Sequence, residues 1–250
     1  MRFLAALLAY TSVCTGWSPQ SPQPSRKRTV RRASDAAWQD FWEDLAARPE
    51  IRDAWRQKPC VLKGIAPADA LTLDALTAAV DADPSTLDDA ARVAHGATQG
   101  WTNVALDDAA RPSRRLRASS SSASVLLNHG GVAFPSLLGG ACRAALDAFE
   151  QPVGLNVYLT GEDVAKAAPA HTDRQEVFVV QCAGAKRWRV FAPPHPPLEP
   201  DADPFARGKG TDVLDERYLP CMLDVALEER DLLYIPAGFP HATATANTSS

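Results

Sequence analysis

Five histidines occur in the 250 residues, and one of them, His171, stands two residues before Asp173 in the stretch PAHTDRQEVFVV. Side chains at positions i and i+2 of a strand point to the same face, so an imidazole and a carboxylate would project together from this stretch. Both groups bind divalent metals of borderline hardness. The pair alone is a weak signal, and a surface histidine beside a helix-capping aspartate is the alternative interpretation.

A second histidine, His241, favours the interpretation as a metal site. It follows the turn PAGFP at residues 236–240 and begins the last predicted strand, 241–246. If that strand neighbours the strand of His171, both imidazoles point into one barrel. Two histidines and one carboxylate leave three positions of a metal open, which is the facial triad of non-haem Fe(II) oxygenases. A buried histidine bonded to a backbone carbonyl is the alternative.

Lys186 is the fourth candidate. It begins a predicted strand and alternates with Trp188 and Val190, so it faces the core if they do, whereas Arg187 and Arg189 take the solvated face. An ammonium inside an apolar barrel is unfavourable unless an anion meets it, and the distal carboxylate of 2-oxoglutarate would be such an anion. The alternative is that Lys186 lies at the strand end and reaches solvent.

The elements that must position these side chains are short strands in the second half of the chain. Asn156 and Tyr158 lie two apart on the first of them, where they either line the same pocket or make ordinary core hydrogen bonds. Ala183-Gly184-Ala185 is a three-residue hairpin loop in which glycine supplies positive φ. Patterns of period two predict strands at 155–159, 176–182, 186–192, 222–227, 232–235 and 241–246.

Helices are predicted in the first half. Trp38, Phe41, Trp42 and Leu45 follow one another at i, i+3, i+4 and i+7, in a helix that Ser34 would cap and that begins at Asp35. Residues 71–80 and 137–149 are further helical segments, and residues 59–64 read as a strand. The pattern predicts a mainly β protein with N-terminal helices, a β-barrel or jelly roll with the helices outside.

Composition excludes several classes of protein. The chain is 46% hydrophobic and 22% charged with a net charge of −4, so the whole molecule is not an electrostatic binder of nucleic acid. Its five cysteines include no C-x-x-C pair, which argues against a zinc knuckle and a dense disulfide framework. Four arginines, Arg111, Arg114, Arg115 and Arg117, precede a serine run at 119–122, and we interpret this region, 111–124, as a mobile loop.

The first 34 residues differ from the rest. A short apolar run at 3–10, too short to span a bilayer, is followed by a basic segment, and no acidic residue occurs before Asp35. This composition favours a targeting segment, with plastid or mitochondrion as the destination. A disordered basic tail on a protein of the nucleus, nucleolus or cytoplasm is the alternative. No other segment is expected to cross a membrane.

Three stretches together resemble the JmjC-type ribosomal oxygenases, also called the cupin-4 group. They are NVYLT at 156–160, HTDRQEVFVVQCAGAKRWRVF at 171–191 and DLLYIPAGFPHATAT at 231–245, and WRQKPCVLKGIAP at 55–67 resembles the family's N-terminal lead-in. The resemblance runs from about Trp38 to the end. It assigns residues 35–150 to a helical N-terminal part and 151–250 to the barrel core.

The resemblance implies a double-stranded β-helix that uses ferrous iron, Fe(2+), together with 2-oxoglutarate and O2. It implies that His171, Asp173 and His241 are the iron ligands, that Lys186 holds the far carboxylate of the cosubstrate, and that Asn156 and Tyr158 line the pocket. Members hydroxylate an Arg or His side chain of ribosomal proteins, and some are described as histone lysine demethylases. The expected partner is therefore a protein substrate, and a homodimer is a further expectation.

Two departures from the family pattern matter. Thr172 stands where the family usually has an aromatic residue, which bears on substrate choice. The chain also stops at Ser250, soon after His241, so we expect a barrel that lacks its last strand, as in a fragment, or one that closes differently. A metal-binding cupin without oxidative chemistry and a non-catalytic interaction domain are the alternatives. Lys186 argues against the first, and the three metal ligands argue against the second.

Overall fold

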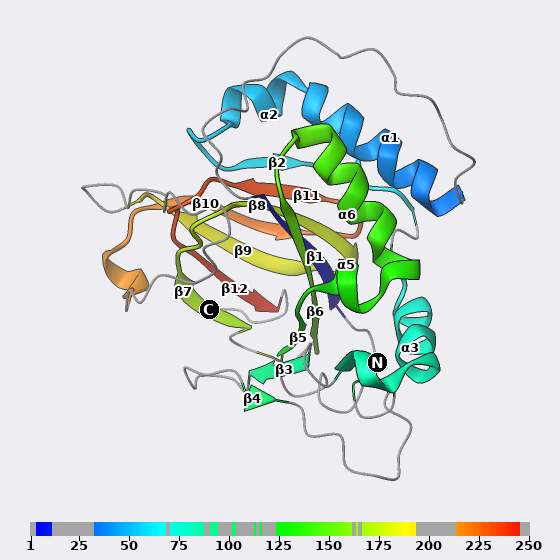
Figure 1. Ribbon diagram of the computed structural model, residues 1–250. Coiled ribbons are helices and arrows are strands. Elements are labelled where there is room, and N and C mark those ends of the chain that lie inside the picture. The colour runs from blue at the N-terminus through cyan, green and yellow to red at the C-terminus, as the bar shows by residue number, and fades with distance from the viewer. Residues whose placement is uncertain are drawn as a thin grey trace.

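The computed structural model describes residues 4–11, 33–68, 71–87, 91–94, 102–103, 113, 116, 124–161, 164, 167–193 and 214–245. In these residues two antiparallel sheets pack face to face, and helices cover the outer face of the larger sheet (Figure 1). The four arginines of the predicted basic strip and the serine run at 119–122 lie outside the described residues.

The larger sheet has eight strands and the smaller has four. In spatial order the larger sheet contains β2 (Cys60–Leu62), β11 (Leu232–Ile235), β8 (Glu176–Ala183), β1 (Leu4–Thr11), β6 (Val153–Thr160), β5 (Ser124–Leu127), β3 (Ala91–Ala94) and β4 (Thr102–Asn103). The smaller sheet contains β10 (Cys221–Leu227), β9 (Lys186–Phe191), β12 (His241–Thr245) and β7 (Ala168–His171). The predicted strands of the second half are therefore present, each within two residues of its expected bounds.

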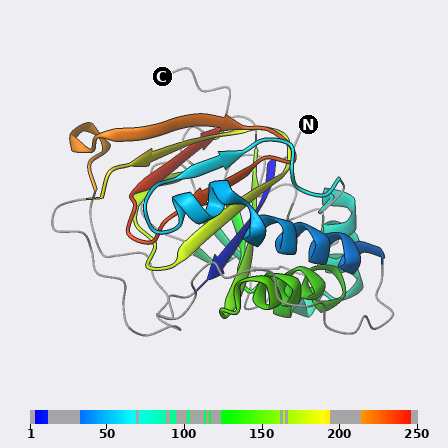
Figure 2. The same cartoon turned by 90° about the horizontal axis from the view of Figure 1, so that it is seen from above.

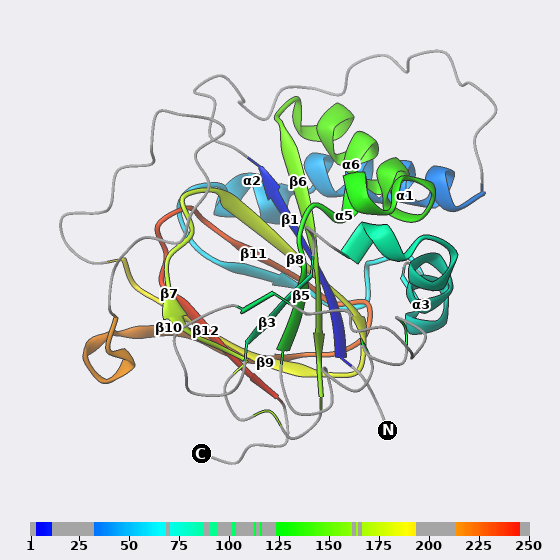
Figure 3. The same cartoon turned by 60° about the horizontal axis from the view of Figure 1, so that its bottom comes forward.

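Strand β1 was not anticipated. It lies between β6 and β8 and is antiparallel to both, with Leu4 opposite Thr160 and Thr11 opposite Glu176 (Figure 3). The sequence placed these residues in a targeting or disordered segment and led us to expect a barrel without its last strand. In the structure the backbone of residues 4–11 joins the two halves of the larger sheet, because β6 and β8 pair with β1 and not with each other.

The N-terminal helices form because apolar residues recur on one face. Helix α1 (Ala33–Ala47) buries Trp38, Phe41, Trp42 and Leu45, the four residues that the spacing selected. It begins two residues before the predicted Asp35, so Ser34 lies inside the helix rather than at its cap. The ring of Trp42 meets Phe149 of α6 (Pro135–Phe149) edge to face, with centroids 6.1 Å apart. Figure 2 shows α1 and α6 side by side.

The remaining helices are shorter. Helix α2 (Pro49–Ala54) starts with proline, which suits the first turn because its missing N–H would have no partner there. Helix α3 (Leu73–Ala82) is capped by Thr72, whose hydroxyl accepts a hydrogen bond from the Ala75 N–H at 3.1 Å. Helix α5 (Gly130–Ala133) precedes α6. Among the described helices, none combines the length and the apolarity that a membrane span requires.

Alternation along the strands separates two cores. On β8, Phe178 and Val180 face the helices, whereas Val177 and Val179 face the smaller sheet. The inner cluster also contains Trp188 and Val190 of β9, Leu227 of β10 and Leu233 and Ile235 of β11. The side of β9 that carries Trp188 and Val190 is therefore buried, as expected. The candidate site residues project into the space between the two sheets.

Candidate metal centre

Strands β7 and β12 are neighbours, as the metal-site interpretation required. Their register places His241 directly opposite His171, and the centroids of the two imidazole rings lie 4.3 Å apart. Seventy residues separate the two histidines in the chain, and the pairing of the strands alone brings them together. Two imidazoles thus meet on the inner face of the smaller sheet.

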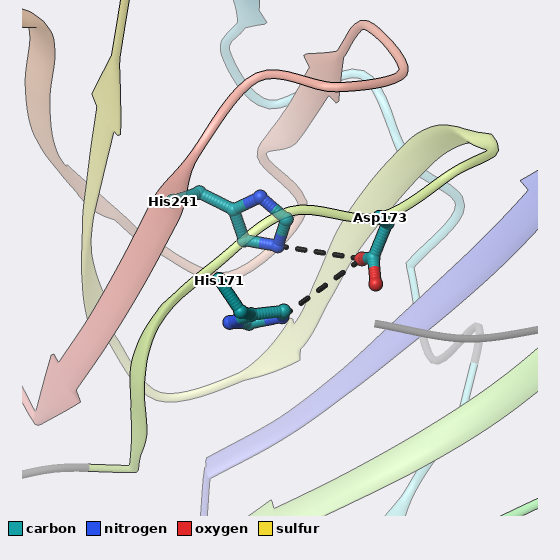
Figure 4. A group of neighbouring side chains, drawn as sticks. All are labelled: His171, Asp173 and His241. Atoms are coloured by element: carbon teal, nitrogen blue, oxygen red, sulfur yellow. Dashed lines mark ion pairs between the residues drawn. The ribbon is translucent and has the colours of Figure 1, made fainter. Parts of the chain in front are cut away.

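Asp173 completes the group. Its Oδ2 lies 3.4 Å from Nε2 of His241 and 3.9 Å from Nε2 of His171, as the dashed lines of Figure 4 indicate. One potential ligand atom from each of the three residues lies within 4.8 Å of the others. The aspartate therefore turns toward the histidines, which contradicts the alternative of a surface histidine beside a capping aspartate.

The ring of His241 is oriented by the turn that precedes it. Its Nδ1 lies 3.1 Å from the carbonyl oxygen of Phe239, and since a carbonyl only accepts, Nδ1 carries the hydrogen. In the neutral ring Nε2 then holds a lone pair directed toward Oδ2 of Asp173. Nε2 is buried and has no hydrogen-bond partner in the part of the chain that the structure describes.

This arrangement fits a divalent cation. A lone pair and a carboxylate oxygen 3.4 Å apart repel one another unless positive charge lies between them. An imidazole that donates its other N–H to a backbone carbonyl is the usual form of a metal-bound histidine. Two imidazole nitrogens and one carboxylate oxygen are also a donor set that suits iron and leaves further positions open.

The site is buried but reachable from one side. His241 is 1% exposed and the Asp173 side chain 7%, whereas the side chain of His171 is 12% exposed. Thr172, between His171 at the end of β7 and Asp173 just beyond it, is also buried. A molecule from solvent would therefore approach on the His171 side.

Lys186 lies inside and not at a solvated strand end. It is only 3% exposed, and its register partners are Thr245 of β12 and Leu227 of β10. Its Nζ donates to Oγ1 of Thr160 at 3.2 Å and lies 5.9 Å from the centre of the Tyr158 ring. Burial lowers the pKa of Lys186 to about 8, because the charged form loses its hydration.

The polar residues of β6 take different roles. Tyr158 contacts the inner cluster, on the same strand face as Thr160. Asn156 uses its Oδ1 to accept the backbone N–H of His129 at 3.1 Å, so this oxygen anchors a turn in which His129 has φ of +55°. Asn156 therefore makes an ordinary local hydrogen bond through Oδ1. Tyr158 lies in the interior between the two sheets.

Sequence reasoning missed two residues around Lys186. Thr160 accepts from the ammonium, and its hydroxyl lies 2.9 Å from that of Ser124 on β5, both of them buried. The signal for Thr160 was present, because it follows Tyr158 at the same-face spacing of two residues. Ser124 had no such signal, since only the pairing of β5 with β6 places it opposite Thr160.

Comparison with known proteins gives matches in the same region. The family model described as JmjC domain matches residues 141–250. A protein of Drosophila mojavensis, "Bifunctional lysine-specific demethylase and histidyl-hydroxylase NO66", is 38% identical over 104 residues, which is 42% of this chain and 11% of that protein. The protein of the same name from Aedes aegypti is 36% identical over 97 residues, or 39% of this chain and 14% of that protein. The chain thus spans a small part of these curated relatives.

Solved structures of an Escherichia coli protein share the fold. "X-Ray structure of E. coli ycfD" superposes with a TM-score of 0.52 at 20% identity, covering 79% of this chain and 49% of that one. "Crystal structure of Escherichia coli ribosomal oxygenase YcfD" gives a TM-score of 0.50 at 20% identity, over 79% of this chain and 47% of the other. At this identity the likeness concerns the fold alone, and it extends beyond residues 141–250 into the helical part.

Proposed function

We propose, from the premise that residues 141–250 form a JmjC domain, that this chain is an Fe(II)- and 2-oxoglutarate-dependent oxygenase that hydroxylates a protein side chain. The observation that carries the proposal is the meeting of His171, Asp173 and His241 on neighbouring elements, with a lone pair and a carboxylate oxygen directed at one point. The double-stranded β-helix, with β1 between β6 and β8, is the framework that we propose for it.

His171, Asp173 and His241 would hold the iron. Ferrous iron and 2-oxoglutarate, when bound, supply the oxidative chemistry, in which O2 and the diacid are consumed, a C–H group becomes C–OH, and succinate and CO2 leave. The chain contributes position and exclusion of water. Phe239 fixes the His241 ring through its carbonyl, and the buried walls around Trp188 and Val190 keep the interior dry.

Lys186 would bind the far carboxylate of 2-oxoglutarate. Its ammonium is buried among neutral groups, the Thr160 hydroxyl and the Tyr158 ring, in the part of the chain that the structure describes. An anion beside it would restore the interaction that hydration gives in water, and would raise the lowered pKa of the lysine. Tyr158 and Asn156 would line the same pocket.

A ribosomal protein is the substrate that we propose, with oxidation at an Arg or His side chain. The support is the printed names of the similar proteins, a histidyl-hydroxylase and a ribosomal oxygenase. Demethylation of a histone lysine is the alternative within the same chemistry, since the NO66 name also includes a lysine-specific demethylase. We also propose, from the family resemblance, that two copies of this chain form a homodimer.

The N-terminal segment enters the proposal separately. We propose that residues 1–34 direct the protein to a plastid or mitochondrion before it folds, on the composition of that segment, and that residues 4–11 stay with the chain and form β1. Fusion of residues 1–34 to a fluorescent protein tests this, with the basic residues 26–32 replaced by glutamine as the control. Fluorescence that stays in the cytoplasm or nucleus contradicts it.

Succinate release tests the catalytic proposal. Protein purified without oxygen is supplied with Fe(II) and 2-oxoglutarate, air is admitted, and succinate is measured with and without ribosomal protein or histone peptides. We expect succinate from the natural sequence and none from His241→Ala. The control is Asp224→Asn, which removes only an exposed ion pair with Arg187 and should leave turnover unchanged. Metal binding without succinate would favour a non-oxidative cupin, and equal activity of His241→Ala would show that the site is wrong.

A further inference from the structure

A second buried carboxylate follows Asp173 closely in the chain but lies on the helix-facing side of the larger sheet. Glu176, the first residue of β8, follows Asp173 by three positions and is 1% exposed. Its side chain points to the same side of β8 as Phe178 and Val180, which face the helices. Val177 and Val179 point to the opposite side, which faces the interior. Glu176 therefore cannot be a metal ligand, although its place in the sequence would allow that interpretation.

The carboxylate of Glu176 is held by three groups. Its Oε2 accepts the hydroxyl hydrogen of Tyr234 at 2.5 Å and the backbone N–H of Ala237 at 3.3 Å, and its Oε1 lies 3.4 Å from Nε of Arg56. Burial raises the pKa of Glu176, while these three partners act to lower it. The contact with Ala237 matters most here, because Ala237 belongs to the turn that leads into His241.

That turn, residues 236–240, touches both Asp173 and His241. The N–H of Gly238 donates to the carbonyl oxygen of Asp173 at 2.8 Å, and the carbonyl of Phe239 orients the His241 ring at 3.1 Å. Gly238 has φ of +79°, a conformation that suits glycine and reverses the chain between these two contacts. A displacement of the turn would consequently move two of the three metal ligands together.

Arg56, in the N-terminal helical part of the chain, holds Glu176 both directly and through Tyr234. The backbone N–H of Arg56 donates to the Tyr234 hydroxyl at 2.9 Å, so this oxygen accepts from Arg56 and gives its hydrogen to Glu176. The Trp55 ring stacks on that of Tyr234, with centroids 5.4 Å apart and planes 11° apart. Arg56 itself has φ of +57°, which sets its N–H and its side chain on the same cluster.

We propose that Glu176 is a positioning residue for the metal centre: anchored by Tyr234 and Arg56, it fixes the turn at 236–240, and the turn sets the His241 ring and the Asp173 backbone. The inference rests on the proposed function, because it assigns these histidine and aspartate side chains to a metal. It also gives the helical part of the chain a role at the site, although Trp55, Arg56 and Glu176 all lie outside the inner core.

Cobalt(II) binding to the purified full chain tests the inference without turnover. The affinity and the visible absorption spectrum of bound Co(II) are measured without oxygen for the natural sequence, Glu176→Gln and Tyr234→Phe. Glu176→Gln keeps the shape but removes the charge that faces Arg56, and Tyr234→Phe keeps the stacking on Trp55 but removes the O–H. We expect Co(II) affinity to fall about tenfold to a hundredfold in each, with a changed spectrum, as is usual when groups that orient metal ligands are removed.

The matched control is Asp231→Asn. Asp231 is a buried carboxylate at the other end of β11, where it accepts from Lys63, Gly64 and Glu228. This variant should lower the melting temperature while the Co(II) affinity stays within twofold. A merely structural role for Glu176 predicts the same pattern, a lower melting temperature with unaltered affinity and spectrum, and that result would overturn the inference. If Glu176→Gln does not fold, Tyr234→Phe decides alone.

The Co(II) measurements also distinguish a failure of the proposed function from a failure of the role of Glu176. No Co(II) binding by the natural sequence would overturn both proposals. Tight binding by the natural sequence that His241→Ala abolishes, with Glu176→Gln and Tyr234→Phe unaffected, would overturn only the role of Glu176.

Discussion

Charged side chains are buried in two places, the turn between β10 and β11 and the interior between the two sheets. Within the described part of the chain, the charge at the turn is neutralised by partners and the charge in the interior is not. At the turn, Asp231 is 3% exposed and accepts from Nζ of Lys63 at 2.7 Å and from the N–H groups of Gly64 and Glu228. In the interior, Lys186 meets a hydroxyl and an aromatic ring, and Nε2 of His241 has no hydrogen-bond partner among the described residues.

The difference separates a charge that the fold itself stabilises from a charge for which we propose a ligand. Burial acts to raise the pKa of Asp231, but the hydrogen bonds from Lys63, Glu228 and Gly64 together lower it below its usual value. Burial lowers the pKa of Lys186 to about 8, and no partner among the described residues opposes this shift. A buried group whose pKa is shifted by desolvation in a concave interior is a candidate for function, whereas a fully partnered group is accounted for by structure.

Replacing Lys186 should have the largest effect and should act in opposite directions on binding and stability. In Lys186→Met we expect the affinity for 2-oxoglutarate to fall about a hundredfold or more, because a desolvated charge pair is lost. The melting temperature of the ligand-free protein should rise, since a buried ammonium without a counter-charge is removed. Calorimetric titration of the Mn(II)-loaded protein and thermal unfolding measure the two effects.

Arg187→Met is the matched control for this substitution. Arg187 is the next residue on β9, but it faces outward and pairs with Asp224 through Nε at 2.7 Å. Its removal should change cosubstrate affinity by less than about twofold. Equal affinities of Lys186→Met and Arg187→Met for 2-oxoglutarate would contradict the assignment of the interior lysine.

The pH dependence of 2-oxoglutarate affinity and of folding stability should follow the protonation of Lys186. With a pKa of about 8 in the ligand-free protein, Lys186 loses its charge above that pH, and 2-oxoglutarate affinity should fall about tenfold by pH 9. Between pH 8 and 10.5 the unfolded chain binds more protons at this residue than the folded one, so its contribution makes stability rise with pH. Titrations and denaturant unfolding across pH 7–10.5 check both trends.

Lys186→Met supplies the reference for these pH profiles, because its difference from the natural sequence isolates one group. The stability difference between the two should shrink as pH rises through 8. Parallel profiles for the two proteins would mean that the lysine does not titrate in this range.

Asp231→Asn should have the smallest effect on ligand binding and a clear one on stability. The change weakens the interactions of one carboxylate with Lys63 and two backbone N–H groups, so we expect a loss of about 2 kcal/mol in the free energy of unfolding. Because the folded pKa of Asp231 is lowered, its contribution is present at neutral pH and is lost as pH falls below about 4. Urea unfolding at pH 7 and pH 3.5 measures this, and a change in 2-oxoglutarate affinity would contradict the separation of the two regions.

Local periodicity was sufficient for most of the elements in the second half. Strands β6, β8, β9, β10, β11 and β12 were predicted within two residues of their bounds, because alternation records which side of each strand is buried, whereas no range was predicted for β7. The resemblance to a JmjC-type family agrees with the family model described as JmjC domain, which matches residues 141–250, since the motifs are short, local and in order along the chain. Strand β1 was not predicted, because an apolar run next to a basic segment reads the same whether or not it pairs with a sheet.

The sequence by itself determined the types and the spacing of the candidate ligands, His171, Asp173 and His241, and the side of β9 on which Lys186 lies. Only the tertiary structure decided that β7 pairs with β12, that Thr160 and Ser124 stand beside Lys186, and that Glu176 faces the helices. The physical reason is that side-chain direction repeats over two residues and can be read locally, whereas strand pairing joins segments that are tens of residues apart. The turn at 236–240 shows both levels: its glycine and prolines mark a reversal of the chain, and its contacts with Glu176 and Asp173 depend on the folded sheet.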